Sequence, residues 1–153
     1  MIYVEAPERT FPTTKKSIFL AGSITGARNW QKEVVQAIKD FDVVVFNPRR
    51  DNFPIHDPSA ALEQITWEHE MLRKADMIQM WFDGNTVSPI CLFELGAWIM
   101  TSKPMVIGMD PNYQRRQDVE IQTKLVRPEI PIVYAMDDFT NVVSDMINQI
   151  LLV

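Results

Sequence analysis

The chain has little of the chemistry that supports a disulfide, a zinc cluster or a membrane span. Its single cysteine, Cys91, excludes an internal disulfide and a cysteine-based zinc cluster, and suits a reducing cytoplasm. Only two histidines occur, and His69 has no second histidine four residues later, so the zinc-protease spacing is absent. No apolar run reaches the ~18 residues that a bilayer-spanning helix needs.

Positive charge is also scarce. Fifteen lysines and arginines stand against 20 aspartates and glutamates, and the net charge of -5 argues against nucleic acid or an anionic membrane as the main partner. No basic start followed by an apolar core and a small-residue cleavage site occurs, so we expect no export signal and a cytoplasmic protein. At 153 residues we expect one domain over 1–153, with 1–16 as an N-terminal arm.

Short apolar runs alternate with helical patterns along the chain. Strands are predicted at 17–21, 43–46, 76–82, 103–108 and 130–134, and helices at about 29–41, 57–74, 88–100 and 138–152. The polar segment 111–124 is expected to form a loop and a short helix. Continuous apolar strands alternating with helices indicate an α/β protein with a parallel sheet covered on both faces. With right-handed crossovers we expect a doubly wound, flavodoxin- or Rossmann-like sheet of five strands in the order 2-1-3-4-5.

The segment 88–100 carries one carboxylate, Glu94, in an otherwise apolar helix, and no other charged residue occurs between Asp83 and Lys103. A helix that is apolar on all sides is normally buried. A buried carboxylate is costly unless it is paired, hydrogen-bonded or protonated, so a chemical role is the first hypothesis. The alternative is a structural glutamate satisfied by hydrogen bonds. Gly96 suggests that another backbone or a ligand approaches closely, because glycine is unfavourable inside a helix.

A second carboxylate, Glu68, lies on the preceding predicted helix. It falls on a stripe of apolar residues three or four apart, namely Ala61, Ile65, Leu72 and Ala75. This spacing predicts that Glu68 points inward, toward the sheet.

Two inward carboxylates without a metal motif suit chemistry on a sugar. One attacks the anomeric carbon, and the other handles the proton on the leaving group. Glu94 is the better candidate for the nucleophile because its helix would hold it rigidly. The proton role falls to Glu68 or to a loop aspartate, Asp51 or Asp83.

In sheets of this type the ligand lies beyond the carboxyl ends of the strands. Four predicted loops meet there, at 22–28, 47–57, 83–88 and from 108 onwards. The first holds Gly22 and Ser23 and offers backbone N–H groups and a hydroxyl at a helix start, which could hold a phosphate or hydroxyl group. A purely structural turn is the alternative. Neither the G-x-G-x-x-G fingerprint nor a Walker motif occurs.

Several short motifs together resemble the nucleoside 2-deoxyribosyltransferase family. They are Gly22-Ser23-Ile24 after a strand, Asn47-Pro48-Arg49-Arg50, Trp67-Glu68, Ala75-Asp76 and Phe93-Glu94-Leu95-Gly96-Ala97. The resemblance covers about 17–108. It implies a Rossmann-like doubly wound fold, a reaction that needs neither cofactor nor metal, and homo-oligomers in which a neighbouring subunit completes the site.

The resemblance also assigns roles to residues. Glu94 would attack C1′ of a 2′-deoxynucleoside, the free base would leave, and a second base would take the sugar with net retention. Glu68 would act on the base and its proton. Substrate contacts are expected from Gly22, Ser23, Asn47, Asp51, Asp83 and Ser88. Ser88 stands where some relatives carry an aspartate that helps hold the sugar.

Two other functions stay open at this point. The same superfamily includes nucleoside 5′-monophosphate N-glycosidases, whose first loop reads roughly Gly-Ser-Ile-Arg-Gly-Gly-Arg. Here Thr25 and Ala27 replace an arginine and a glycine, which weakens a phosphate site and favours nucleosides over nucleotides. A nucleoside or nucleotide hydrolase is therefore the second candidate, and a non-catalytic nucleoside-binding module, which the fold alone does not exclude, is the third.

Overall fold

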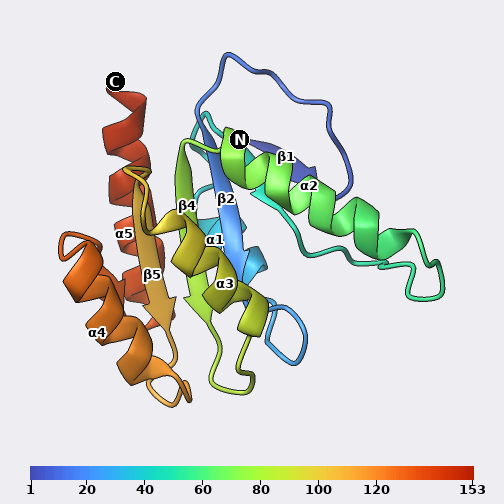
Figure 1. The fold of residues 1–153 in the computed structure, drawn as a ribbon. Helices are drawn as coiled ribbons and strands as arrows, with labels where there is room; N and C mark the ends of the chain where they lie inside the picture. Colours follow the sequence, from blue (N-terminus) through green and yellow to red (C-terminus); the bar gives the residue numbers. More distant parts are fainter.

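A sheet of six parallel strands forms the centre of the protein, in the order β1-β3-β2-β4-β5-β6 (Figure 1). The computed structural model describes all 153 residues. The strands are β1 (Ile2–Glu5), β2 (Ser17–Gly22), β3 (Val44–Asn47), β4 (Met77–Phe82), β5 (Met105–Met109) and β6 (Ile132–Val133). The α/β class and the parallel sheet predicted from the sequence are confirmed.

The prediction of five strands in the order 2-1-3-4-5 is wrong, because the segment taken as an arm supplies a sixth strand. Strand β1 pairs with β3 in parallel, from Ile2 opposite Val44 to Glu5 opposite Asn47. Its apolar run is too short to predict a strand by itself, and the backbone hydrogen bonds of the neighbouring strand create it. The other five strands lie side by side in the order β3-β2-β4-β5-β6.

Five helices cover the two faces of the sheet (Figure 1). They are α1 (Trp30–Ala37), α2 (Ala60–Lys74), α3 (Pro89–Trp98), α4 (Arg116–Val126) and α5 (Met136–Leu151). Helices α2, α3 and α4 pack on one face, where Trp67, Leu95 and Val119 join the core. Helices α1 and α5 pack on the other face through residues such as Trp30 and Phe139. None of these helices is both long and apolar enough to cross a membrane.

Helix α3 is not buried on all sides, contrary to the prediction from its composition. Cys91, Leu95 and Ile99 face the core, whereas Ile90 is 63% exposed and Phe93 76% exposed. Gly96 has open space around it, since a Cβ at this position would have no heavy atom within 4 Å. The expected close approach to Gly96 therefore does not occur within this chain.

The turn after β2 is fixed by the packing of the sheet. Gly22 has a φ of +141°, and a Cβ there would lie 2.3 Å from the carbonyl oxygen of Trp81 on β4. Only glycine tolerates both the conformation and the contact. Arg49, just after β3, donates to the carbonyl oxygens of Ala27 (3.1 Å) and Arg28 (2.8 Å). The two loops are thereby tied together at the carboxyl edge of the sheet.

Candidate active site

Glu94 on α3 and Glu68 on α2 face the same region above the sheet. Burial, and secondly the nearby charge of Glu68, raise the pKa of Glu94 to about 8. Burial also raises the pKa of Glu68. Two carboxyls in a poorly solvated site do not both ionise readily, so the pair tends to keep one proton between them. That arrangement provides one carboxylate and one carboxylic acid.

Glu68 is held by a neighbour on its own helix. The side-chain Nε2 of Gln64 donates to Glu68 Oε1 (2.9 Å) and to the carbonyl oxygen of Pro48 (2.7 Å). The hydrogen bond from Gln64 favours the charged form of Glu68 and opposes the effect of burial on its pKa. The predicted apolar stripe is only partly right, because Ile65 is 65% exposed while Trp67 is fully buried.

Ser23 and Ser88 meet below the start of α3. Their hydroxyl oxygens lie 2.6 Å apart, and Ser23 Oγ also accepts from the backbone N–H of Asp83 (2.9 Å). Ser88 is the N-cap residue of α3 and has a left-handed backbone with a φ of +50°, but its side chain makes no cap hydrogen bond. Its hydroxyl is paired with that of Ser23 instead. These three predicted residues are brought together.

The side chain of Asp83 is used within its own loop. Its Oδ1 accepts from the backbone N–H and the side-chain amide of Asn85, at 2.9 and 3.0 Å. Gly22 precedes Ser23 and shapes the turn through the close contact with β4 described above. Gly22 and Asp83 therefore shape the two loops that carry Ser23 and Ser88.

Asn47 and Asp51 lie on the β1–β3 side of the sheet. Asn47 is 4% exposed, and its side chain donates to Tyr3 Oη (2.7 Å) and accepts from the backbone N–H of Arg49 (3.0 Å). Asp51 lies exposed in the turn after β3. Burial raises the pKa of the Tyr3 phenol, and the charge of Asp51 adds a smaller contribution in the same direction. The amide of Asn47 is thus already bonded within the chain, and the role of both residues in substrate binding stays a prediction.

The sequence patterns did not identify Gln64 or Arg49 as parts of the site. Gln64 precedes Glu68 by four residues, a spacing at which helical side chains touch, so the pair could have been found. The partners of Arg49 are backbone carbonyls of another loop, and no sequence pattern indicates them. Cys91 also lies close, because burial and the charges of Glu94 and Glu68 raise the pKa of its thiol to about 12. That thiol stays protonated and is a poor nucleophile.

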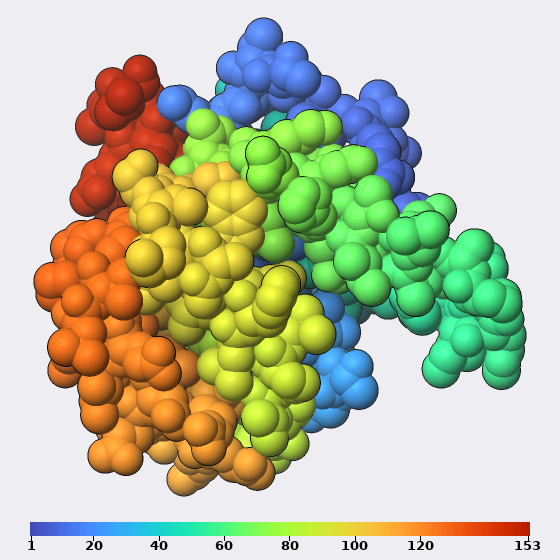
Figure 2. Space-filling view, in the orientation of Figure 1, coloured from blue at the N-terminus to red at the C-terminus, as the bar shows by residue number.

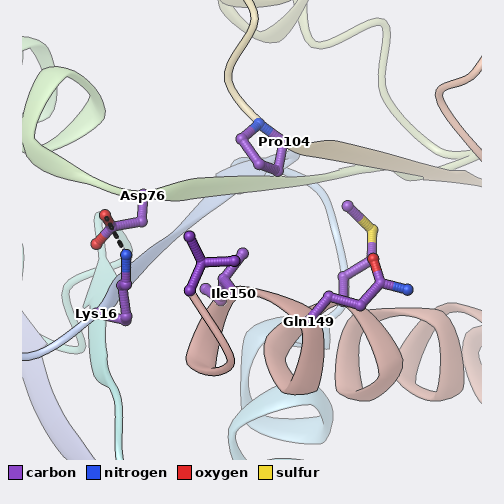
Figure 3. A pocket seen from close by; sticks show the side chains of 7 residues that line it. Lys16, Asp76, Pro104, Gln149 and Ile150 are labelled. Atoms are coloured by element: carbon purple, nitrogen blue, oxygen red, sulfur yellow. Dashed lines mark ion pairs between the residues drawn. The ribbon is translucent and has the colours of Figure 1, made fainter.

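No group of three or more histidine, cysteine, aspartate or glutamate side chains could hold a metal ion. Two cavities in the protein are lined by neither Glu68 nor Glu94. One, of about 350 Å³, lies at the amino ends of the strands, between α5 and an ion pair of Lys16 with Asp76 (Figure 3). The other, of about 330 Å³, lies between α3 and α4.

Comparisons with known proteins bear on the family and the fold. Residues 15–113 match the family described as "Nucleoside 2-deoxyribosyltransferase like". Among solved structures, one of a 2-deoxyribosyltransferase from the psychrotolerant bacterium Bacillus psychrosaccharolyticus matches with a TM-score of 0.57 and 20% identity, covering 82% of this chain and 90% of that chain. At that identity the likeness concerns the fold. Comparison with curated protein sequences gave no match.

Proposed function

Because the chain belongs to the nucleoside 2-deoxyribosyltransferase-like family, we propose that it transfers a 2-deoxyribosyl group between purine or pyrimidine bases. The observation that carries the proposal is the pair of half-buried carboxyls, Glu94 and Glu68, which interact across α3 and α2. A binding module has no need of two neighbouring carboxyls whose ionisation is opposed by burial.

In the proposed reaction the carboxylate of Glu94 attacks C1′ of the deoxynucleoside. The C1′–N bond breaks, its electron pair goes to the base nitrogen, and the carboxylic acid of Glu68 supplies the proton. A covalent glutamyl-deoxyribosyl intermediate remains. A second base then attacks C1′, gives its proton to Glu68 and releases Glu94, so two inversions give net retention.

The contacts around the first loop favour nucleosides over nucleotides as substrates. The Arg28 guanidinium lies 3.5 Å from Glu33 and stacks over the Trp81 ring at 5.7 Å. Arg49 donates to backbone carbonyls and to the side chain of Gln31. Both cations near this loop are therefore engaged within the chain, and a phosphate would have to compete with those contacts.

A base-exchange assay tests the proposal. The protein is incubated with a 2′-deoxynucleoside and a different free base, and the products are separated by chromatography. A new deoxynucleoside supports transfer, whereas free base and free sugar without exchange indicate a hydrolase with water as the acceptor. The same assay with a 5′-monophosphate tests the nucleotide alternative.

Glu94→Ala is the decisive variant in this assay. Removing the nucleophile should reduce turnover to the background rate, while circular dichroism and the melting temperature stay close to those of the wild type. Ser144→Ala, on the far side of the sheet in α5, serves as the matched control and should leave turnover unchanged. Normal turnover by Glu94→Ala would remove this residue as the nucleophile.

We expect the protein to act as a homo-oligomer through the face that carries α2 and α3. Figure 2 shows this face, where the two helices lie side by side and the segment before α2 projects from the body. Large apolar side chains are exposed on it, among them Leu62, Ile65, Ile90, Phe93 and Met100. An apolar patch of this kind marks an interface in a soluble protein.

Sedimentation measurements on Phe93→Asp test this expectation. A charge at the centre of an apolar contact should shift the wild-type oligomer toward monomer. Leu125→Asp on α4, at a side chain of similar exposure, is the control for a non-specific effect of the charge. A monomeric wild-type protein would contradict the expectation.

A further inference from the structure

Gln64 occupies a junction between the loop after β3 and the carboxyl pair. One amide hydrogen of its side chain goes to the carbonyl oxygen of Pro48, and the other goes to Oε1 of Glu68. The carbonyl oxygen of Pro48 can only accept, so it fixes which atom of the Gln64 amide is the nitrogen. A flipped amide would place two acceptors against each other.

This orientation constrains Glu68. Since Gln64 Nε2 is a donor, Glu68 Oε1 accepts, and the carbonyl oxygen of a protonated carboxyl is the better acceptor. The contact therefore favours a proton on the other oxygen, Oε2. Folding alone does not account for the arrangement, because Gln64 Oε1 is left buried without a hydrogen-bond partner. The amide uses both its hydrogens to hold the acid against the loop and leaves its own acceptor unsatisfied.

We propose that Gln64 is a positioning residue that directs the proton of Glu68 to Oε2, the oxygen that serves the leaving base. The proposal rests on the proposed function for its kinetic consequence, and on the hydrogen bonds alone for its structural part. During base departure the proton moves from Glu68 Oε2 to the base nitrogen while Gln64 continues to donate to Oε1. The carboxylate formed in this step is therefore stabilised by a hydrogen bond that is already in place.

Gln64→Met is the test variant, because methionine keeps the length of the side chain and removes both donors. Glu63→Met is the matched control. It breaks another side-chain contact between this loop and α2, the ion pair of Glu63 with Arg50 at 3.1 Å, without touching Glu68. A merely structural role of Gln64 would give the two variants similar behaviour.

Two substrates separate proton donation from other effects. A 2′-deoxynucleoside needs a proton on its leaving base, whereas 4-nitrophenyl 2-deoxyriboside does not, because 4-nitrophenolate leaves as a stable anion. For Gln64→Met we expect kcat on the nucleoside to fall by about tenfold or more, with KM within about twofold, and little change on the nitrophenyl deoxyriboside. Equal losses on both substrates, or no loss on the nucleoside, would overturn the proposal.

A titration that needs no turnover distinguishes failure of this proposal from failure of the proposed function. Carbon-13 NMR of labelled glutamate carboxyls, assigned with Glu68→Gln, follows the protonation of Glu68 directly. Loss of the Gln64 hydrogen bond should move the titration of Glu68 to higher pH, because that bond favours the charged form. An unchanged midpoint in Gln64→Met would refute the positioning role even if the protein moved no deoxyribose.

Discussion

Replacing Glu68 with glutamine removes a charge and a proton donor at once, and the two losses act in opposite directions. The negative charge of Glu68 is the second cause of the raised pKa of Glu94, after burial. Without it Glu94 ionises at lower pH, which favours nucleophilic attack. Without the carboxylic acid, a poor leaving group departs unprotonated, which slows the same reaction.

The size of each effect follows from the structure. With a pKa of about 8, Glu94 is ionised in about one molecule in ten at pH 7. For a substrate that needs no proton, removing the charge of Glu68 therefore raises the reactive fraction by at most about tenfold. Loss of the general acid costs about 10²–10⁴-fold on a substrate that needs the proton. The activity of Glu68→Gln on a 2′-deoxynucleoside should fall by about 100-fold or more. Its activity on 4-nitrophenyl 2-deoxyriboside should rise by up to about tenfold.

The pH profiles of the wild type and of Glu68→Gln should differ in shape. The pKa of about 8 belongs to a coupled pair, so below about pH 8 Glu94 and Glu68 hold one proton between them, and above it both are ionised. In the wild type the reactive pair holds one proton, so activity on the nucleoside should be bell-shaped, with its alkaline limb near pH 8 where the second carboxyl ionises. For Glu68→Gln, the rate on 4-nitrophenyl 2-deoxyriboside should rise with pH in a single step whose midpoint lies below pH 8.

Steady-state kinetics with both substrates between pH 4 and pH 10 measures these quantities. Equal losses on the two substrates would refute the division of labour between Glu94 and Glu68. So would a wild-type rate on the nucleoside that rises through pH 8 to a plateau, because a doubly ionised pair has no proton to give.

Further predictions concern the stability of the fold. Gly22→Ala should lower the free energy of unfolding by about 1–3 kcal/mol or more, because its Cβ would overlap the backbone of β4; Gly96→Ala, in open space, should be stabilising by up to about 1 kcal/mol. Gln79→Met should raise the free energy of unfolding by about 1–3 kcal/mol, because both amide atoms of Gln79 are buried without partners. Urea denaturation measures all three, and destabilisation by Gln79→Met would show that the amide has a partner, such as a buried water.

The sequence predicted most of the sheet because its strands are buried on both faces and read as continuous apolar runs. Strand β1 escaped because a short edge strand depends on its neighbour rather than on its own pattern. The proline-bearing residues after it have no regular secondary structure. Local pattern therefore predicts central strands well and edge strands poorly.

The candidate site was predictable only as far as single residues carry a signal. Glu94 could be singled out because a charge is rare within an apolar helix, and Glu68 because it interrupts an apolar spacing. The exposed face of α3 was not predictable, because composition does not tell which apolar side chains meet the sheet. The partners of Arg49 were not predictable either, since they depend on how two loops meet in space.

In the single chain the carboxyl pair is only partly shielded from water. The carboxyls of Glu94 and Glu68 owe their raised pKa values first to burial, so their chemistry depends on what excludes water from them. Yet the outward side of α3 around Phe93 is open to solvent in the single chain. A second copy covering that side would deepen the burial of both carboxyls and raise the pKa of each further. The alkaline limb of the pH profile should then lie at lower pH in a monomeric Phe93→Ser variant, which adds no charge beside Glu94, than in the wild type. A simple loss of folded protein would not produce this shift.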